Sequence, residues 1–176
     1  MSRVFHFRQA IDTPWTALPP IRVGQVPSGL ATPSEYLLIE RDGQPECRAD
    51  LFQGTDELYT KTAAVEWGSA VLIGFGHSLY LIDVAERTVQ ARRLPSYFDG
   101  FYSAGPHLLV AFGEGLLSLR SNGQLEWQNA NLAIDGIEVT EVKDGVISGR
   151  GEWDPPGGWQ PFRVDLETGE ILNGAA

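Results

Sequence analysis

Few residues of this chain have types and positions that could support chemistry, and two aspartates are the first of them. Asp99 and Asp135 each precede a glycine, in Asp99-Gly100 and Asp135-Gly136. Two carboxylates brought together could hold a divalent cation, because hard cations prefer oxygen ligands. An Asp-Gly pair is also a common turn, in which the carboxylate accepts hydrogen bonds from nearby N–H groups. The sequence leaves both interpretations open.

Histidine, serine and aspartate occur close together at His77, Ser78 and Asp83, and these are the residue types of a serine hydrolase. The nucleophile-elbow pattern is absent, however, and adjacent residues on a strand point to opposite faces. His6 and His107 have no companions at the spacing of metal ligands. We therefore predict no catalytic residue, no metal site and no cofactor.

The stretch GEWDPPGGWQPF, residues 151–162, places two tryptophans around a Pro-Pro-Gly-Gly core. This core excludes both a helix and a regular strand. Trp153 and Trp159 could pack on the prolines of their own loop. They could also present a rigid aromatic surface to a partner, since an ordered loop loses little entropy on binding. Glu152 and Asp154 add negative charge beside them.

The composition is that of a soluble globular protein, with 43% hydrophobic residues and a formal net charge of -10 over 176 residues. This charge repels nucleic acid and anionic lipid and favours a basic protein as a partner. The first residues show no signal-peptide core and no apolar run is long enough to span a membrane. A single cysteine, Cys47, forms no internal disulfide. We expect a cytoplasmic protein.

Similar segments recur along the chain at a nearly constant spacing. VLIGFGHSLYLIDVAERTVQARRL at 71–94 aligns with LLVAFGEGLLSLRSNGQLEWQNANL at 108–132, and a third copy begins with VISGRGEW at 146–153 and resumes with PFRVDLETGEIL at 161–172. Gly76, Gly113 and Gly151 take equivalent places. The tryptophan stretch is therefore an enlarged form of the short link that follows this glycine.

Each copy consists of short apolar runs bounded by turn residues, which is the signature of strands and hairpins. Further runs at 62–67, 97–103 and 136–142 precede the three copies and bring each to four strands. We predict one domain over 1–176, with repeats at about 62–94, 97–132 and 136–172 and a possible degenerate repeat at 1–52. The only candidate helical turn lies at 56–61.

The segments SLYLIDVAERTVQ, LLSLRSNGQLEW and RVDLETGEIL resemble the blade ends of quinoprotein-like and other WD-like bacterial propellers, over residues 36–172. The tryptophan stretch is similar to one in uncharacterised bacterial propeller-like proteins. The resemblance implies an all-β fold, a small or partial β-propeller of three to four antiparallel four-stranded sheets. It implies no activity, because three or four blades leave no place for a quinone site.

Propeller geometry would bring the distinctive residues to one face. The links after the second strand of each blade carry His77, Glu114 and the stretch 152–160, and the links between blades carry Asp56, Asp99 and Asp135. We predict a non-catalytic module for protein–protein recognition through an acidic, tryptophan-bearing face, and an inhibitor or immunity-type protein is one form of it. The alternative is a propeller that binds a sugar or another small molecule, with a cation-dependent enzyme as one form. The predicted binding residues are His77, Asp99, Glu114, Asp135, Glu152, Trp153, Asp154 and Trp159.

The alternation of apolar residues also predicts which side chains form the core between the sheets. These are Val71, Ile73, Leu79, Leu81, Leu109, Leu117 and Val146.

Overall fold

A computed structural model describes residues 2–29, 31–55 and 61–172 of the chain. The described residues form fifteen β-strands and one 3-10 turn at Trp15–Ala17, so the protein is nearly all β. The strands build four sheets, and the chain divides into two compact units at residues 1–92 and 93–176, with two sheets in each. The predicted single domain over 1–176 stays a prediction, as does the helical turn, most of which lies outside the described residues.

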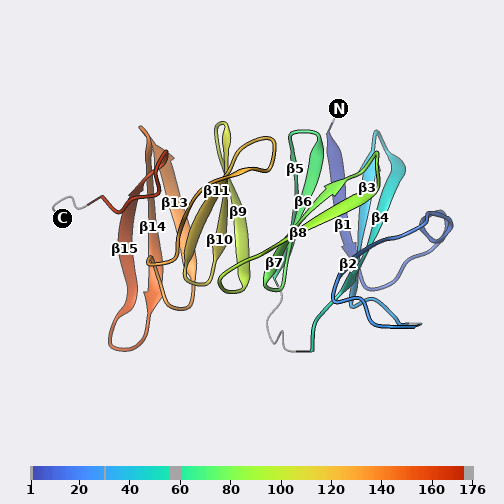
Figure 1. The fold of residues 1–176 in the computed structure, drawn as a ribbon, viewed down its shortest axis with the longest axis horizontal. Helices are drawn as coiled ribbons and strands as arrows, with labels where there is room; N and C mark the ends of the chain where they lie inside the picture. Colours follow the sequence, from blue (N-terminus) through green and yellow to red (C-terminus); the bar gives the residue numbers. More distant parts are fainter. Residues whose placement is uncertain (1, 30, 56–60, 173–176) are drawn as a thin grey trace. The chain divides into compact units, whose positions relative to one another are not determined.

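The first sheet of unit 1 has the strand order β1-β3-β4-β2 (Figure 1). Its strands are β1 (Arg3–Arg8), β2 (Ile21–Gly24), β3 (Glu35–Arg41) and β4 (Gln44–Phe52). β1, β3 and β4 pair antiparallel, whereas β2 joins the outer edge of β4 in parallel. Pro14, Pro19 and Pro20 interrupt the segment between β1 and β2. Because β1 and β2 are not joined by a tight turn, they need not be neighbours in the sheet.

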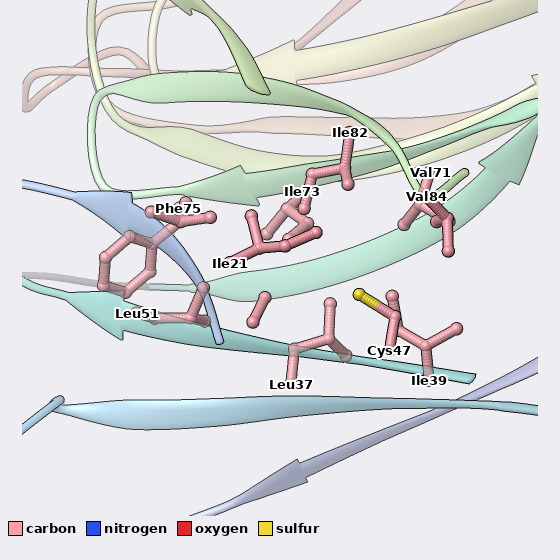
Figure 2. Packing of buried hydrophobic residues seen from close by; sticks show 12 residues of the cluster. Ile21, Leu37, Ile39, Cys47, Leu51, Val71, Ile73, Phe75, Ile82 and Val84 are labelled. Atoms are coloured by element: carbon pink, nitrogen blue, oxygen red, sulfur yellow. The ribbon is translucent and has the colours of Figure 1, made fainter. Parts of the chain in front are cut away.

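The second sheet of unit 1 runs in chain order, β5-β6-β7-β8. Its strands are β5 (Thr62–Trp67), β6 (Ala70–Phe75), β7 (Ser78–Asp83) and β8 (Thr88–Arg93). Figure 2 shows the core between the two sheets, where Leu37 and Ile39 of β3 lie across from Ile73 of β6 and Ile82 of β7. Cys47 of β4 is part of this core and fully buried, and burial raises the pKa of its thiol.

Unit 2 contains a four-stranded and a three-stranded sheet, both in chain order. The first is built from β9 (Phe98–Ala104), β10 (His107–Phe112), β11 (Gly115–Leu119) and β12 (Leu125–Asn129), and the second from β13 (Ile137–Lys143), β14 (Val146–Trp153) and β15 (Gly158–Asp165). Leu109 and Leu116 pack with Ile137, Ile147 and Val164 between the sheets.

The predicted all-β class of propeller-like sheets is confirmed, with one difference in the last sheet. It has three strands instead of four, and a single bridge between Val164 and Ile171 stands in place of the fourth. The repeat alignment also agrees with the strands, because β6 ends at Phe75 and β10 ends at Phe112, and each is the second strand of its sheet. Residues 3–52 form a sheet as well, but one of different strand order.

Five of the seven predicted core residues are buried, and the predictions for the other two are wrong. Of the five, Leu79 and Leu117 lie on the faces of their sheets opposite to Val71 and Leu109. Val71, Ile73, Leu79, Leu109 and Leu117 are at most 2% exposed. Leu81 and Val146 are only half-buried, while their neighbours Ile82 and Ile147 are fully buried. Ile82 pairs with Val71 and Leu81 with Leu72, so Leu81 lies on the face of the sheet opposite to Val71. A run of consecutive apolar residues hides this alternation.

Among the described residues, no helix has the length and hydropathy required to cross a membrane.

Candidate functional site

In unit 2 the link between β12 and β13, residues 130–136, lies across the ends of the two neighbouring hairpins. The N–H of Gly136 donates to the carbonyl of Gly113 at 2.7 Å, and the N–H of Leu132 donates to the carbonyl of Glu114 at 3.1 Å. On its other side the link meets β14, because the N–H of Ile134 donates to the carbonyl of Glu152 at 2.8 Å. Backbone hydrogen bonds therefore hold these three segments together at one end of the unit.

A tyrosine joins the two predicted aspartates at this end. The hydroxyl of Tyr97 donates to the carboxylate of Asp135 at 2.9 Å and lies 2.8 Å from its carbonyl oxygen. Asp99 accepts a hydrogen bond from the N–H of Ile137 at 3.2 Å. Burial raises the pKa of Tyr97, and the hydrogen bond to Asp135 and the negative charges of Asp135, Asp99 and Glu152 raise it further. These carboxylates therefore lie near one phenol.

Glu152 and Trp159 complete the arrangement. They are opposite each other in the register of β14 and β15, so their side chains share one face. Both lie over Gly136, where an added Cβ would be 3.4 Å from the Trp159 ring and 3.6 Å from a Glu152 oxygen. We call Tyr97, Asp99, Asp135, Glu152 and Trp159 the acidic–aromatic patch. The Trp159 side chain remains substantially exposed within it, at 45% for the residue.

The tryptophan stretch forms a longer hairpin and not the separate loop that was predicted. β14 continues through Gly151 to Trp153, β15 begins at Gly158, and only residues 154–157 form the turn. The N–H of Gly157 donates to the carbonyl of Asp154 at 2.7 Å, and the Pro155–Pro156 bond is cis. Gly151 pairs with Gln160 inside the ladder. The extra residues therefore lengthen β14 and β15 before the prolines end the pairing.

Trp153 and Trp159 lie on opposite faces of this hairpin. Trp159 shares a face with Glu152, and Trp153, the next residue on the strand, points to the other face. The prediction that both tryptophans form one surface is therefore wrong. The half-buried Trp153 instead borders a groove of about 850 Å³, which is lined chiefly by apolar side chains including Leu132, Ile134, Phe162, Ile171 and Leu172.

The remaining predicted residues have different surroundings. Glu114 follows the end of β10 and is half-buried, and its N–H donates to the hydroxyl of Ser96 at 3.2 Å. Asp154 is exposed at the hairpin turn and borders the groove. His77 lies in the corresponding link of unit 1, between β6 and β7. Asp56 lies outside the described residues.

Asp99 and Asp135 both take part in hydrogen bonds in this structure. Among the described residues, no group of three or more histidine, cysteine, aspartate or glutamate side chains has an arrangement that could hold a metal ion. Each aspartate has a hydrogen-bonding role instead, Asp99 toward the N–H of Ile137 and Asp135 toward Tyr97. The interpretation of these carboxylates as acceptors for nearby groups fits the structure better.

A buried polar cluster in unit 2 was not predicted from the sequence. Nδ1 of His107 is 2.7 Å from Oε2 of Glu126, and the hydroxyl of Ser118 donates to the same oxygen at 2.8 Å. Arg120 donates to the other oxygen at 2.8 Å. Nε2 of His107 is 3.3 Å from the carboxylate of Glu167. Ser118 is fully buried, so its hydroxyl has no access to a substrate.

This cluster predicts a loss of stability in acid. Partial burial raises the pKa of Glu126, but the hydrogen bonds from Arg120, His107 and Ser118 lower it to about 2, from an ordinary value of 4.5. The stabilisation is therefore complete above about pH 4.5 and is lost as the pH falls toward 2. Urea unfolding between pH 7 and pH 2.5 measures the free energy of unfolding. Glu126→Gln should have a lower value than wild type at pH 7, and the difference between the two should decrease as the pH falls. A stability difference that does not change with pH would contradict the prediction. Glu170→Gln, which changes an exposed carboxylate, is the control.

Comparison with known structures identifies the type of fold. No family model and no curated protein matches the chain. Its structure is similar to the N-terminal domain of Nup159, with 11% identity and a TM-score of 0.50, over 98% of this chain and 50% of that one. It is also similar to the Pan2 WD40 domain of Neurospora crassa, with 13% identity and a TM-score of 0.49, over 78% of this chain and 45% of that one. The chain thus spans about half the length of each, and the likeness shows a β-propeller type of fold without indicating an activity.

Proposed function

We propose that this protein is a non-catalytic recognition module that binds a basic segment of another protein through the acidic–aromatic patch. The observation that supports this most strongly is that Asp99, Asp135 and Glu152 lie near the Tyr97 hydroxyl. Glu152 also shares a face with Trp159, which remains 45% exposed. Within the part of the chain that the structure describes, the carboxylate of Glu152 has no cationic partner. A lysine or arginine from a partner would supply one.

The patch offers a cation two kinds of contact. Carboxylates form charge-assisted hydrogen bonds with guanidinium and ammonium groups. The face of a tryptophan attracts the same groups, and Arg150 already lies 5.7 Å from the centre of the Trp159 ring. Arg150 also forms an ion pair with Glu138. The net charge of -10 would draw a basic partner toward the protein at long range.

An inhibitor or immunity-type protein that covers a basic enzyme in the cytoplasm would be one form of this function. Such proteins gain speed and specificity from complementary charge. The alternative of a sugar-binding or cation-dependent enzyme has less support. The groove beside Trp153 is concave, but Asp154 is the only carboxylate among its described lining residues, so no pair of carboxylates converges there for acid–base chemistry.

The test compares capture of partners by wild type and by a patch variant carrying Asp135→Asn, Glu152→Gln and Trp159→Ala. Each protein is immobilised and exposed to lysate of the source organism, and the captured proteins are identified by mass spectrometry. We expect wild type to retain one or more basic proteins that elute at raised salt, because salt screens attraction between charges. The patch variant should lose these proteins at least tenfold, because tryptophans are frequent hot spots of binding and three patch residues are changed together.

A matched control carries Glu86→Gln and Glu170→Gln, which change exposed carboxylates that are not members of the patch. This control should capture the same proteins as wild type. Equal capture by the patch variant, with its circular dichroism unchanged, would contradict the proposal. An equal loss in the control would show that only overall charge matters, which would contradict it as well.

A further inference from the structure

Among the described residues, the first half of the outer strand of the last sheet has no neighbour on its outer edge. β15 is the outer strand of a three-stranded sheet, whereas the other sheets have four strands. Its second half is engaged, because Leu172 donates to the carbonyl of Arg163 at 2.8 Å and Asp165 donates to the carbonyl of Glu170 at 2.9 Å. In the described residues, no strand pairs with the outer edge of the first half, residues 158–162.

The alternation of an antiparallel ladder identifies the open backbone groups. Arg163 and Asp165 direct backbone hydrogen-bonding groups to the outer edge. These groups point to opposite sides of the strand in successive residues, so those of Trp159 and Pro161 also face the outer edge. The edge therefore presents the N–H and C=O of Trp159 and the C=O of Pro161. Proline has no N–H, and for that reason it is tolerated at this place. A short added strand can therefore pair with this edge, but Pro161 interrupts the hydrogen bonds of a longer one.

The two faces beside this edge differ in chemistry. On one face lies the apolar groove bordered by Trp153 and Phe162. On the other lie Trp159 and Glu152 of the acidic–aromatic patch. Side chains of an added strand alternate between the two faces. A strand on this edge would therefore place every second side chain toward the groove and the others toward the face that carries Trp159 and Glu152.

We propose that β15 binds an extended segment of a partner protein as an added strand, and that this segment alternates apolar with basic residues. Main-chain hydrogen bonds to Trp159 and Pro161 would supply affinity, as in other cases of strand addition, and the two faces would supply specificity. The apolar side chains enter the groove and the basic ones lie along Trp159 toward Glu152. The inference rests on the proposed function, because the basic residues use the same patch.

Synthetic peptides test this chemistry directly. Fluorescence anisotropy measures the binding of a labelled octapeptide of alternating valine and lysine, and of the matched valine–glutamate octapeptide. We expect the lysine peptide to bind at least tenfold more tightly. Trp153→Ala should weaken it about tenfold by opening the groove, and Glu152→Gln should weaken it by reducing the charge. Equal affinity for both peptides would overturn the proposal.

N-methylated peptides separate strand pairing from side-chain binding. Two valine–lysine peptides carry N-methyl groups on alternate amides in opposite registers, so that only one of them blocks the amides that face β15. One should lose binding at least tenfold and the other should keep it, and hydrogen exchange at the Trp159 amide should slow only with the second. If both bind equally well, strand addition is wrong while the proposed function stands. Strand addition is also wrong, and the proposed function stands, if neither peptide binds while the patch variant still loses its captured proteins.

Two other occupants of the edge give different results. Light scattering that shows a dimer, dissociated by the valine–lysine peptide, would assign the edge to a second copy of the chain. Binding of the peptide only to a chain that ends at Leu172 would assign it to residues 173–176. Either result would overturn the proposal, whereas a monomer whose full chain binds the peptide supports it.

Discussion

Replacing Gly151 with alanine should destabilise unit 2 by about 3 kcal/mol, because the new methyl group has no space. An added Cβ would lie 1.9 Å from the carbonyl oxygen of Leu132 and 2.9 Å from the Cβ of Ala133. The first of these is a backbone atom in a segment held by the hydrogen bond from Leu132 to Glu114. Neither β14 nor the link can move aside without breaking such bonds.

Urea unfolding followed by circular dichroism would measure this loss. Gly100→Ala is the matched control, since Gly100 also lies in a strand of unit 2 but its added Cβ would be 3.8 Å from the nearest atom, on the Tyr102 ring. We expect the control to change the free energy of unfolding by about 0.5 kcal/mol or less. A similarly small effect of Gly151→Ala would show that the link does not lie against β14.

The second large effect is expected for Leu109→Ala, which should cost about 2–5 kcal/mol. Leu109 is 0% exposed and lies in the core between the two sheets of unit 2, with Leu116, Ile137 and Ile147. Truncation to alanine removes buried methyl groups and leaves a cavity that close-packed sheets fill only in part.

Ile171→Ala serves as the control for Leu109→Ala, because Ile171 is also apolar but 48% exposed. It should cost below about 1 kcal/mol, since its side chain is already largely in water. Urea unfolding of the two variants at the same pH and temperature compares their free energies of unfolding. If the two variants were equally stable, the core of unit 2 would not lie on this face of β10.

The repeat and most strand positions were predictable because local signals mark them. The run predicted at 62–67 coincides with β5 (Thr62–Trp67), and the Phe-Gly pairs mark the ends of β6 and β10. Turn residues and short apolar runs act over a few positions, and these are the distances that a single sequence reveals. The nearness of Asp99, Asp135 and Glu152 follows from propeller geometry, which brings the links between blades and the links after each second strand to one face.

Other features depend on contacts between distant segments. The sequences of β2 and β4 do not indicate that these strands pair in parallel, because each has the pattern of an ordinary short strand. The opposite faces of Trp153 and Trp159 follow from the register of a hairpin whose length could not be deduced once two prolines suggested a loop. Tyr97 went unnoticed because an aromatic residue before a strand is normally core, and only its contact with Asp135 indicates another role.

Pro161 has a consequence for solubility. Exposed strand edges are the sites where copies of one protein stack into aggregates, and such stacking needs an unbroken series of donors and acceptors. On the open edge of β15, Pro161 removes one donor in the middle of that series. A fibre growing from this edge would leave a backbone acceptor of each incoming copy without a partner. Pro161 would thus limit the growth of aggregates from this edge, although no described strand covers it.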